Sequence, residues 1–337
     1  MFLAVLNIPA QLQAESTPLS LTLPTDNDAI YRGDGPEFYQ YIDRDYQGVK
    51  STPWEGGQYG FVRNPVPTGN GMVFTKFHEG IDIRPLQRDE SGEPTDPVRA
   101  IAAGQIVHAS AVAGYSNYGK YVVVEHRWDG CSYYSLYAHL NSIQVQIGQH
   151  VEQHDQLGVM GHTGEGLDQK RAHLHLELNL MLSRQFEQWH DALFKNDPNR
   201  HGLFNGLNLT GMDIARLFLA LRKSPNLTIP EFLAQEQTLY RILLPDSPHF
   251  DLKKMYPWML AKNSEKAVSW EVSFNREGVP LRIEPNGKQV NGPELSYYKK
   301  GAIDPVYQMR GQIAGRGENA HLTDKGRLFM RLLIFPD

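Results

Sequence analysis

The sequence predicts a mainly β protein: an antiparallel β-sheet core, a helical appendage and a small C-terminal β module. Three observations predict this fold class. Between residues 51 and 182, short apolar alternations recur between glycines and prolines, which is typical of antiparallel sheets or sandwiches. A helical apolar period appears only from about residue 183, and strand-like alternation returns after residue 265.

Length and composition limit the number of domains and the classes of protein to consider. The 337 residues are enough for two or three domains. The formal net charge of −5 lacks the basic excess of a nucleic-acid binder, and no stretch approaches the ~18 apolar residues of a membrane span. The single cysteine, Cys131, excludes an intramolecular disulfide and a cysteine-rich zinc site. Composition leaves the oligomeric state open.

The chain before the β-rich region divides into two parts. Residues 1–14 are interpreted either as a truncated signal segment, with Leu12-Gln13-Ala14 as the cleavage site, or as a short disordered terminus. Residues 15–50 are polar and rich in turn formers. We expect this second part to form an extended lead-in that packs on the β-rich region.

Within residues 51–182 we expect strands over 98–102, 105–109, 121–126, 132–140, 143–147, 156–160 and 173–180. Segments 102–107 and 147–151 look alike, because each places a Gly-Gln pair before a valine. They resemble the hairpins of biotinyl/lipoyl-type folds. A carrier function would need a modifiable lysine at a hairpin tip, and the hairpin after Ile147 has none, so this interpretation is set aside.

Residues 183–260 are expected to be helical. Ile214, Leu217, Phe218 and Leu221 form an apolar stripe. The segment 228–231 is typical of a capping box, and a helix is expected to follow over 232–244. Residues 265–337 are expected to form a small all-β domain with strands at 268–274, 279–284, 306–313 and 327–334.

The run 172–178 holds the most informative motif, His173-Leu174-His175. The alternation predicts a strand, in which residues two apart point to the same face. Two neighbouring imidazoles on one face can bind a metal and place a second nitrogen beside it. Taken alone, the motif is also compatible with two solvent-facing histidines whose leucines face the core.

A second group lies upstream, where His78 and Asp82 are four residues apart and share a face in either a helix or a strand. With one imidazole from His173 or His175 they would supply two nitrogens and one oxygen. Zinc accepts such a set and keeps a fourth position for water, whose pKa it lowers to about 7. The other histidine of the pair and His139 would then act as base, acid or transition-state donor.

The order of these motifs carries more information than any one of them. H-x-x-x-D comes first, followed by a Pro-Val-x-Ala hairpin, the Tyr137-Ala138-His139-Leu140 strand end and, last, H-x-H-x-E. This series resembles the lysostaphin-type zinc metallopeptidases, the β-lytic and murein endopeptidase family, over about residues 70–182. The resemblance implies one zinc ion per chain, with His78, Asp82 and His175 as ligands. It also implies catalytic roles outside the ligand set for His139 and His173.

The sequence departs from the family pattern just before H-x-H. The usual short Ser/Thr-Gly turn is replaced by the longer loop 164–171, and Ala172 stands where the family has proline. In the family this loop rims the substrate groove, so the departure bears on substrate preference more than on chemistry. Tyr115, Asn117 and Tyr118 are interpreted either as groove-lining or as packing residues.

The resemblance implies a zinc-dependent metalloendopeptidase that hydrolyses peptide cross-links of bacterial peptidoglycan. Such an enzyme must be exported to the periplasm, the cell envelope or the medium, where its substrate lies. A non-catalytic wall-binding or hydrolase-activating protein on the same fold is the alternative, because some family members have lost zinc ligands. All five positions are filled here, which counts against it. A structural β protein with an incidental metal site would leave the order of the motifs to chance.

Overall fold

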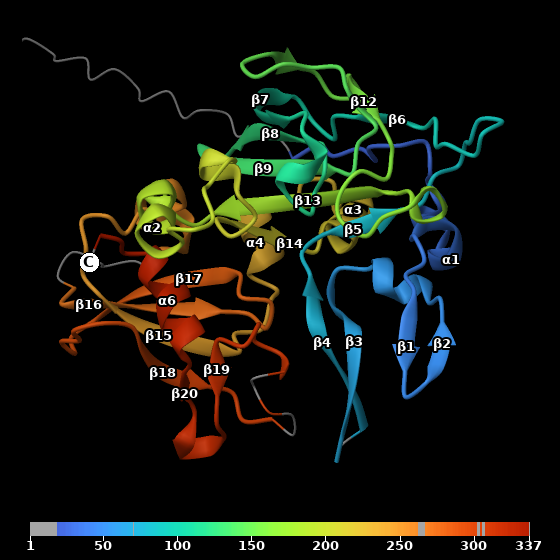
Figure 1. Ribbon diagram of the computed structural model, residues 1–337. Helices are drawn as coiled ribbons and strands as arrows, with labels where there is room; N and C mark the ends of the chain where they lie inside the picture. The colour runs from blue at the N-terminus through green and yellow to red at the C-terminus, as the bar shows by residue number, and fades with distance from the viewer. Residues whose placement is uncertain (1–18, 70, 262–266, 302–303, 305–306, 337) are drawn as a thin grey trace, which may run out of the picture.

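The computed structural model describes residues 19–69, 71–261, 267–301, 304 and 307–336. The expected fold class is confirmed, because the described chain is mainly β and its named strand pairs are antiparallel. Figure 1 shows a central sheet, a second sheet made by the C-terminal part, and two hairpins that extend away from the central sheet. Among the helices of the described residues, none has the length and apolarity to span a membrane.

The central sheet has seven strands in the order β11-β7-β8-β9-β13-β14, with β5 also paired to β13. β5 and β14 follow one another along the same side of β13, since β5 pairs with its first residues and β14 with its last. The bounds are β5 (Ile81–Ile83), β7 (Gly104–Ser110), β8 (Tyr121–Trp128), β9 (Cys131–Ala138), β11 (His150–Val151), β13 (Leu174–Met181) and β14 (Leu209–Met212).

A three-stranded sheet accompanies the central sheet, built from β6 (Pro97–Arg99), β12 (Gln156–Val159) and β10 (Ser142–Ile143). The strand expected over 143–147 is therefore shorter and ends at Ile143. The two similar Gly-Gln segments pair with each other, with Gly104 opposite Val151 and Gln105 opposite His150. Two 3-10 turns lie in the connections, η3 (Ala113–Tyr115) and η4 (Gln169–Arg171).

The alternation on β13 explains how the histidine motif is presented. The leucines of the strand belong to the main hydrophobic core and are fully buried. His173 and His175 therefore point to the opposite face, yet they are only 5% and 6% exposed. The leucines do turn to the core, but the histidines are covered by other parts of the chain and do not face solvent.

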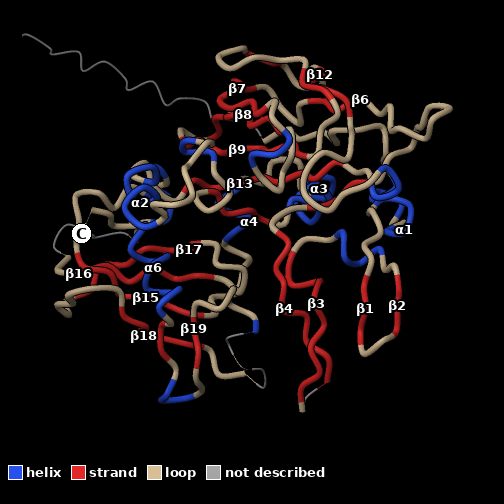
Figure 2. Tube along the Cα trace, in the orientation of Figure 1, coloured by secondary structure: helices blue, strands red, loops and turns tan. Residues whose placement is uncertain are grey.

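The lead-in forms part of the sheet system. After η1 (Ala29–Arg32) and α1 (Gly35–Phe38), Tyr39 bridges to Ile83 of β5. The amide of Gln40 donates to the carbonyl of Asp82 (2.8 Å). The chain then forms the hairpin β1 (Arg44–Tyr46) and β2 (Val49–Ser51), the turn η2 (Trp54–Gly57), and the long hairpin β3 (Gly60–Thr68) and β4 (Gly71–His78). Figure 2 shows both hairpins extending in the same direction.

Residues 183–260 are mixed and not purely helical. The predicted stripe lies on α3 (Ile214–Lys223), and the capping box between Thr228 and Glu231 is present. The helix expected over 232–244 is wrong, because α4 (Ile229–Leu233) stops early and β15 (Tyr240–Pro245) follows. β15 pairs on both sides. The remaining elements are α2 (Phe186–Leu193), η5 (Gly202–Phe204), α5 (Leu252–Met255) and η6 (Pro257–Met259).

The C-terminal part centres on the sheet β17-β16-β15-β18. Its strands after β15 are β16 (Ser269–Phe274), β17 (Pro280–Asn286) and β18 (Glu294–Tyr298), followed by β19 (Ile313–Ala314), η8 (Gly317–Asn319) and β20 (His321–Leu322).

The all-β expectation for 265–337 is wrong at its end. Residues 327–334 are not a strand, because α6 (Asp324–Leu332) begins there with Thr323 as its N-cap. Of the expected strand 306–313, only Ile313 is in a strand, and residue 306 lies outside the described residues.

Candidate metal centre

Two of the predicted ligands meet because their strands are neighbours. β5 pairs with β13 so that Asp82 stands directly opposite His175. Side chains opposite one another on adjacent strands lie within contact distance. Oδ1 of Asp82 is 2.9 Å from Nδ1 of His175. The pair is 93 residues apart in sequence, so strand register alone brings these two groups together.

His78 reaches the same point from the end of β4. Its Nε2 lies 3.0 Å from Oδ1 of Asp82 and 3.0 Å from Nδ1 of His175. A tight turn at Glu79 and Gly80 connects β4 to β5. A Cβ on Gly80 would lie 2.2 Å from the carbonyl oxygen of Leu176 on β13. A side chain at this position would therefore push the turn off the sheet and separate His78 from Asp82.

These three side chains form a group able to hold a metal ion, since one ligand atom from each lies within 4.8 Å of the others. Their hydrogen bonds also fix suitable tautomers. Nδ1 of His78 faces the carbonyl of Gln58 (2.7 Å), and Nε2 of His175 faces a carboxylate oxygen of Glu177 (2.8 Å). Each imidazole thus has a hydrogen-bond acceptor at one nitrogen, and its other nitrogen, beside Asp82, can bind a metal once it has lost its proton. The donor set fits zinc, which binds imidazole nitrogen and carboxylate oxygen.

The two other predicted histidines lie beside the ligand group. Nδ1 of His173 donates to the carbonyl of Arg171 (2.7 Å), and its Nε2 is 3.3 Å from Oδ1 of Asp82. Nδ1 of His139 donates to the carbonyl of Thr163 (2.8 Å). The ring centroids of His139 and His173 are 4.7 Å apart. The structure therefore brings all five predicted site residues together, with two imidazoles whose Nε2 atoms are not bound to the main chain.

A buried network supports His175 from behind. Glu177 is 1% exposed and uses both carboxylate oxygens. Oε1 accepts from His175 and from the hydroxyl of Tyr118 (2.7 Å), while Oε2 accepts from the amide of Asn179 (2.9 Å). The glutamate ends the H-x-H-x-E motif, but the motif alone assigned it no role. Its spacing two residues after His175 on a strand places it on the same face.

The charges of the site favour an ionised Asp82. Burial alone would raise the pKa of this carboxyl, but His173, His78 and Arg63 hold its pKa well below the usual value. Burial lowers the pKa of His78 to about 4. Burial alone would lower the pKa of His175, but hydrogen bonds to Asp82 and Glu177 raise it to about 9. A metal ion therefore has to displace a proton from His175.

His139 is set to be neutral. Burial, together with the nearby imidazoles of His173 and His175, holds its pKa well below the usual histidine value. A neutral imidazole whose Nδ1–H is donated to a carbonyl keeps a lone pair on Nε2. His139 is therefore neutral at neutral pH, with a lone pair at Nε2.

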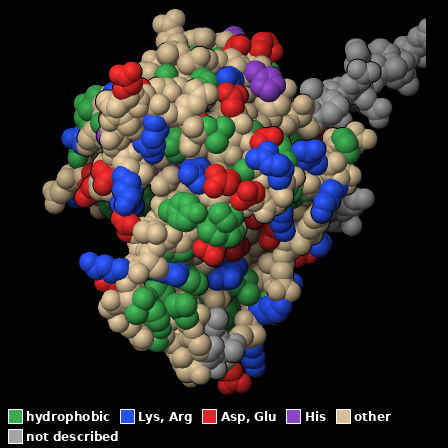
Figure 3. All heavy atoms as spheres, turned by 90° about the vertical axis from the view of Figure 1, so that its right-hand side faces the viewer, with side chains coloured by type: hydrophobic (Ala, Val, Ile, Leu, Met, Phe, Trp, Pro, Cys, Tyr) green, Lys and Arg blue, Asp and Glu red, His purple; other side chains and the backbone are tan. Residues whose placement is uncertain are grey.

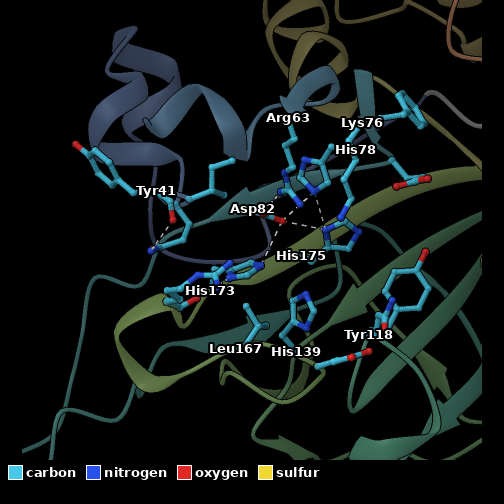
Figure 4. Close-up of a pocket in the computed structure, with 17 residues that line it drawn as sticks. Tyr41, Arg63, Lys76, His78, Asp82, Tyr118, His139, Leu167, His173 and His175 are labelled. Atoms are coloured by element: carbon cyan, nitrogen blue, oxygen red, sulfur yellow. Dashed lines mark hydrogen bonds and ion pairs between the residues drawn. The ribbon is translucent and has the colours of Figure 1, made fainter. Parts of the chain in front are cut away.

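The five residues open onto a cavity of about 440 Å³, which we call the metal-centre cavity. Figure 4 shows the four histidines and Asp82 converging on it, with Arg63 reaching Asp82 from above. Arg63 lies on β3, forms an ion pair with Oδ2 of Asp82, and donates from Nε to the carbonyl of Gly56 (2.8 Å). Arg63 was not predicted as a site residue, because no local motif marks it.

The rim of the metal-centre cavity combines expected and unexpected segments. Glu165, Leu167 and Arg171 line it, so the long loop before H-x-H borders this cavity. Asn117 and Tyr118 also line the cavity. Tyr115 does not; it is 46% exposed, with the guanidinium of Arg200 5.0 Å from its ring centroid. The lead-in also contributes Gln40, Tyr41 and Ile42, a contribution that the sequence did not predict.

Comparisons with known proteins place part of the chain beside a family of peptidases. Residues 76–186 match the model of peptidase family M23. An uncharacterized metalloprotease of Buchnera aphidicola subsp. Baizongia pistaciae (strain Bp) is 29% identical over 155 residues. That match covers 45% of this chain and 35% of the relative, so the chain spans about a third of the relative's length.

Two solved peptidase structures are similar to part of the chain. A zinc-containing peptidase from Vibrio cholerae is 24% identical with a TM-score of 0.30, covering 48% of this chain and 37% of that one. The catalytic domain of the antimicrobial peptidase lysostaphin from Staphylococcus simulans is 22% identical with a TM-score of 0.27. The match covers 46% of this chain and 85% of that one. The resemblance to lysostaphin-type metallopeptidases that the motifs predict is thus confirmed over residues 76–186, the stretch that matches the family M23 model.

Proposed function

We propose that the protein is a zinc-dependent metalloendopeptidase that hydrolyses peptide cross-links of bacterial peptidoglycan. The observation that carries the proposal is the convergence of His78, Asp82 and His175 within 4.8 Å, with two further imidazoles beside them. A metal-binding protein without catalysis would need only the first three groups. The match to peptidase family M23 and the resemblance to murein endopeptidases supply the substrate class.

Zinc bound at this site would supply an acidified water molecule and would polarise the carbonyl of the scissile bond. Nε2 of His78, Nδ1 of His175 and Oδ1 of Asp82 would hold the ion. His139 or His173 would accept a proton from water at Nε2, because each donates its Nδ1–H to a main-chain carbonyl. The water oxygen adds to the carbonyl carbon, the C–N bond breaks, and the accepted proton passes to the departing amine.

The peptidoglycan substrate lies outside the cytoplasmic membrane, so the proposal includes export to the periplasm, the cell envelope or the medium. The cavity of about 440 Å³ is within the usual range for ligand sites. It is bordered on one side by the lead-in and on another by the loop before H-x-H. A peptide strand would therefore lie in a groove with walls from both parts of the chain.

The decisive experiment is digestion of purified peptidoglycan, with release of peptides as the readout. The zinc-loaded wild type should release peptides and a chelator should stop it. His175→Ala and Asp82→Asn should lose both zinc and cleavage, whereas His173→Ala should keep about one zinc per chain and lose cleavage. A wild type that binds zinc and never releases peptides would instead favour a wall-binding or hydrolase-activating protein. Full activity of His173→Ala would overturn its assigned role.

A further inference from the structure

A second cavity adjoins the metal-centre cavity beside the lead-in. It measures about 260 Å³ and shares Gln40, Tyr41 and Arg171 with the metal-centre cavity, so these residues stand between the two. We call it the basic cavity. Figure 3 looks onto the side of the molecule that carries α1 and the β1–β2 hairpin, where basic side chains are spread across the face with acidic ones between them.

The charges that line the basic cavity are unbalanced. Four of its lining residues are cations, Arg84, Arg88, Lys170 and Arg171, and Asp43 is the one carboxylate among the described residues that line it. The chain as a whole carries a formal net charge of −5. The positive charge is therefore a local property of this cavity, and a cleft lined by one sign of charge concentrates ligands of the opposite sign.

Two of the guanidinium groups are held in place without being neutralised. Nη1 of Arg88 donates to the carbonyls of Gly92 (2.8 Å) and Gln169 (2.9 Å). Nη1 of Arg171 donates to the carbonyl of Gly166 (2.9 Å). Carbonyl oxygens orient a guanidinium but leave its positive charge in place. The Nε of Arg171 is buried and has no hydrogen-bond partner among the described residues.

The other two cations differ in how they are held. Lys170 is exposed and makes no hydrogen bond or ion pair with the described part of the chain. Arg84 donates to the carbonyl of Pro36 (3.1 Å) and pairs at 3.3 Å with Glu37, which lies outside the lining of the basic cavity, so its charge is compensated in part. A ligand carboxylate entering the cavity would thus meet several charged donors, and charge-assisted hydrogen bonds of this kind are the stronger ones.

We propose that the basic cavity binds a free carboxylate of the peptide substrate, so that the enzyme prefers acidic peptides to their amidated counterparts. The proposal rests on the proposed endopeptidase function and names its substrate class more narrowly. Arg171 connects the two cavities directly, since its side chain lines both and its carbonyl accepts from Nδ1 of His173 (2.7 Å). A carboxylate held there fixes the substrate next to a catalytic imidazole.

The test compares one cross-linked muropeptide with free carboxylates and the same molecule with those carboxylates amidated. Binding is measured by calorimetry on the full zinc-loaded chain carrying His139→Ala, which prevents turnover. The acid form should bind about tenfold more tightly than the amide form. Adding Lys170→Gln and Arg88→Gln should remove most of that difference. Adding Lys195→Gln instead, an exposed lysine outside both cavities, should leave it unchanged.

Kinetics on chains with an intact His139 separate this proposal from the proposed function. The acid form should have the higher kcat/KM, and Lys170→Gln should raise its KM at nearly unchanged kcat. Equal binding and equal cleavage of the two forms would overturn the carboxylate site and leave the endopeptidase function standing. Tighter binding of the acid form without any cleavage would support the carboxylate site and count against the endopeptidase function.

Discussion

Glu177 lies two residues after His175 on the same strand and accepts a hydrogen bond of 2.8 Å from its Nε2. This contact keeps Nδ1 of His175 free to face Asp82. Glu177→Gln should weaken zinc binding about 10- to 100-fold, because the ligand loses a charged partner and the new amide faces the amide of Asn179. Competition with a chelator measures the affinity. Glu79→Gln, which changes a carboxylate of the same cavity without touching a ligand, should bind zinc normally, and equal affinities for both variants would refute the role of Glu177.

Gly80 lets the turn between β4 and β5 lie against β13. Gly80→Ala would place a Cβ 2.2 Å from the carbonyl oxygen of Leu176, so the turn must move and His78 must leave Asp82. We expect loss of zinc and a destabilisation on the order of 2 kcal/mol, measured by metal analysis and urea unfolding. Gly114→Ala is the matched control, since its Cβ would meet no atom within 4 Å. A zinc-loaded Gly80→Ala variant would contradict this role of the turn.

Arg63 contributes to the low pKa of Asp82. Removing its charge in Arg63→Ala should raise the pKa of that carboxyl, so protons would compete with zinc at a higher pH than in the wild type. The pH at which half the zinc is released should therefore shift upward, and Arg63→Lys should lie between the two. Metal retention across an acid pH series measures this shift. An unchanged or lower release pH in Arg63→Ala would show that the ion pair does not stabilise the ionised ligand.

Glu277 predicts a pH dependence of stability away from the metal. Burial, together with Glu236 and Asp213, raises its pKa to about 7 from 4.5. The folded state thus favours the neutral form of Glu277. The contribution of this group to the free energy of unfolding is complete below pH 4.5 and is lost as the pH rises through 7.

Glu277→Gln should therefore be more stable than the wild type at pH 8, on the order of 2 kcal/mol, and nearly equal to it at pH 4. Urea unfolding at both pH values, with a chelator present, gives the comparison. Glu318→Gln, at an exposed position, should keep the wild-type pH dependence. A stability gain from Glu277→Gln that is the same at both pH values would exclude titration of this carboxyl as the cause.

The parts of the site that the sequence predicts are those encoded in short spacings. The leucines of β13 alternate with histidines, so the spacing by itself assigns both histidines to one face. Arg63 could not be found in this way, because it reaches Asp82 only through the course of the β3–β4 hairpin, 19 residues away. Gln40 and Tyr41 were also missed, since nothing in their neighbourhood indicates that the lead-in runs beside β5.

The wrong element predictions have a similar cause. The apolar residues after Phe232 fit a helical period as well as a strand, and pairing of β15 with strands on both sides decides the outcome. Near the C-terminus, the apolar run around Leu332 predicts a strand by its composition. Thr323 caps a helix there through the amide of Gly326, and tertiary packing buries Met330 and Leu332. Where an apolar pattern fits both a helix and a strand, secondary-structure propensity discriminates weakly between them. Contacts with distant parts of the chain then determine which one forms.

Three of the four clustered imidazoles are oriented by carbonyl oxygens, at Gln58, Thr163 and Arg171. A main-chain carbonyl persists whatever side chain the position carries, so these three positions can diverge without disturbing the rings they orient. The orientation of His175 depends instead on the side chain of Glu177. Mutational robustness is therefore uneven across the centre, and among the groups that orient the four rings Glu177 is the one whose side chain cannot change without disturbing the imidazole it holds.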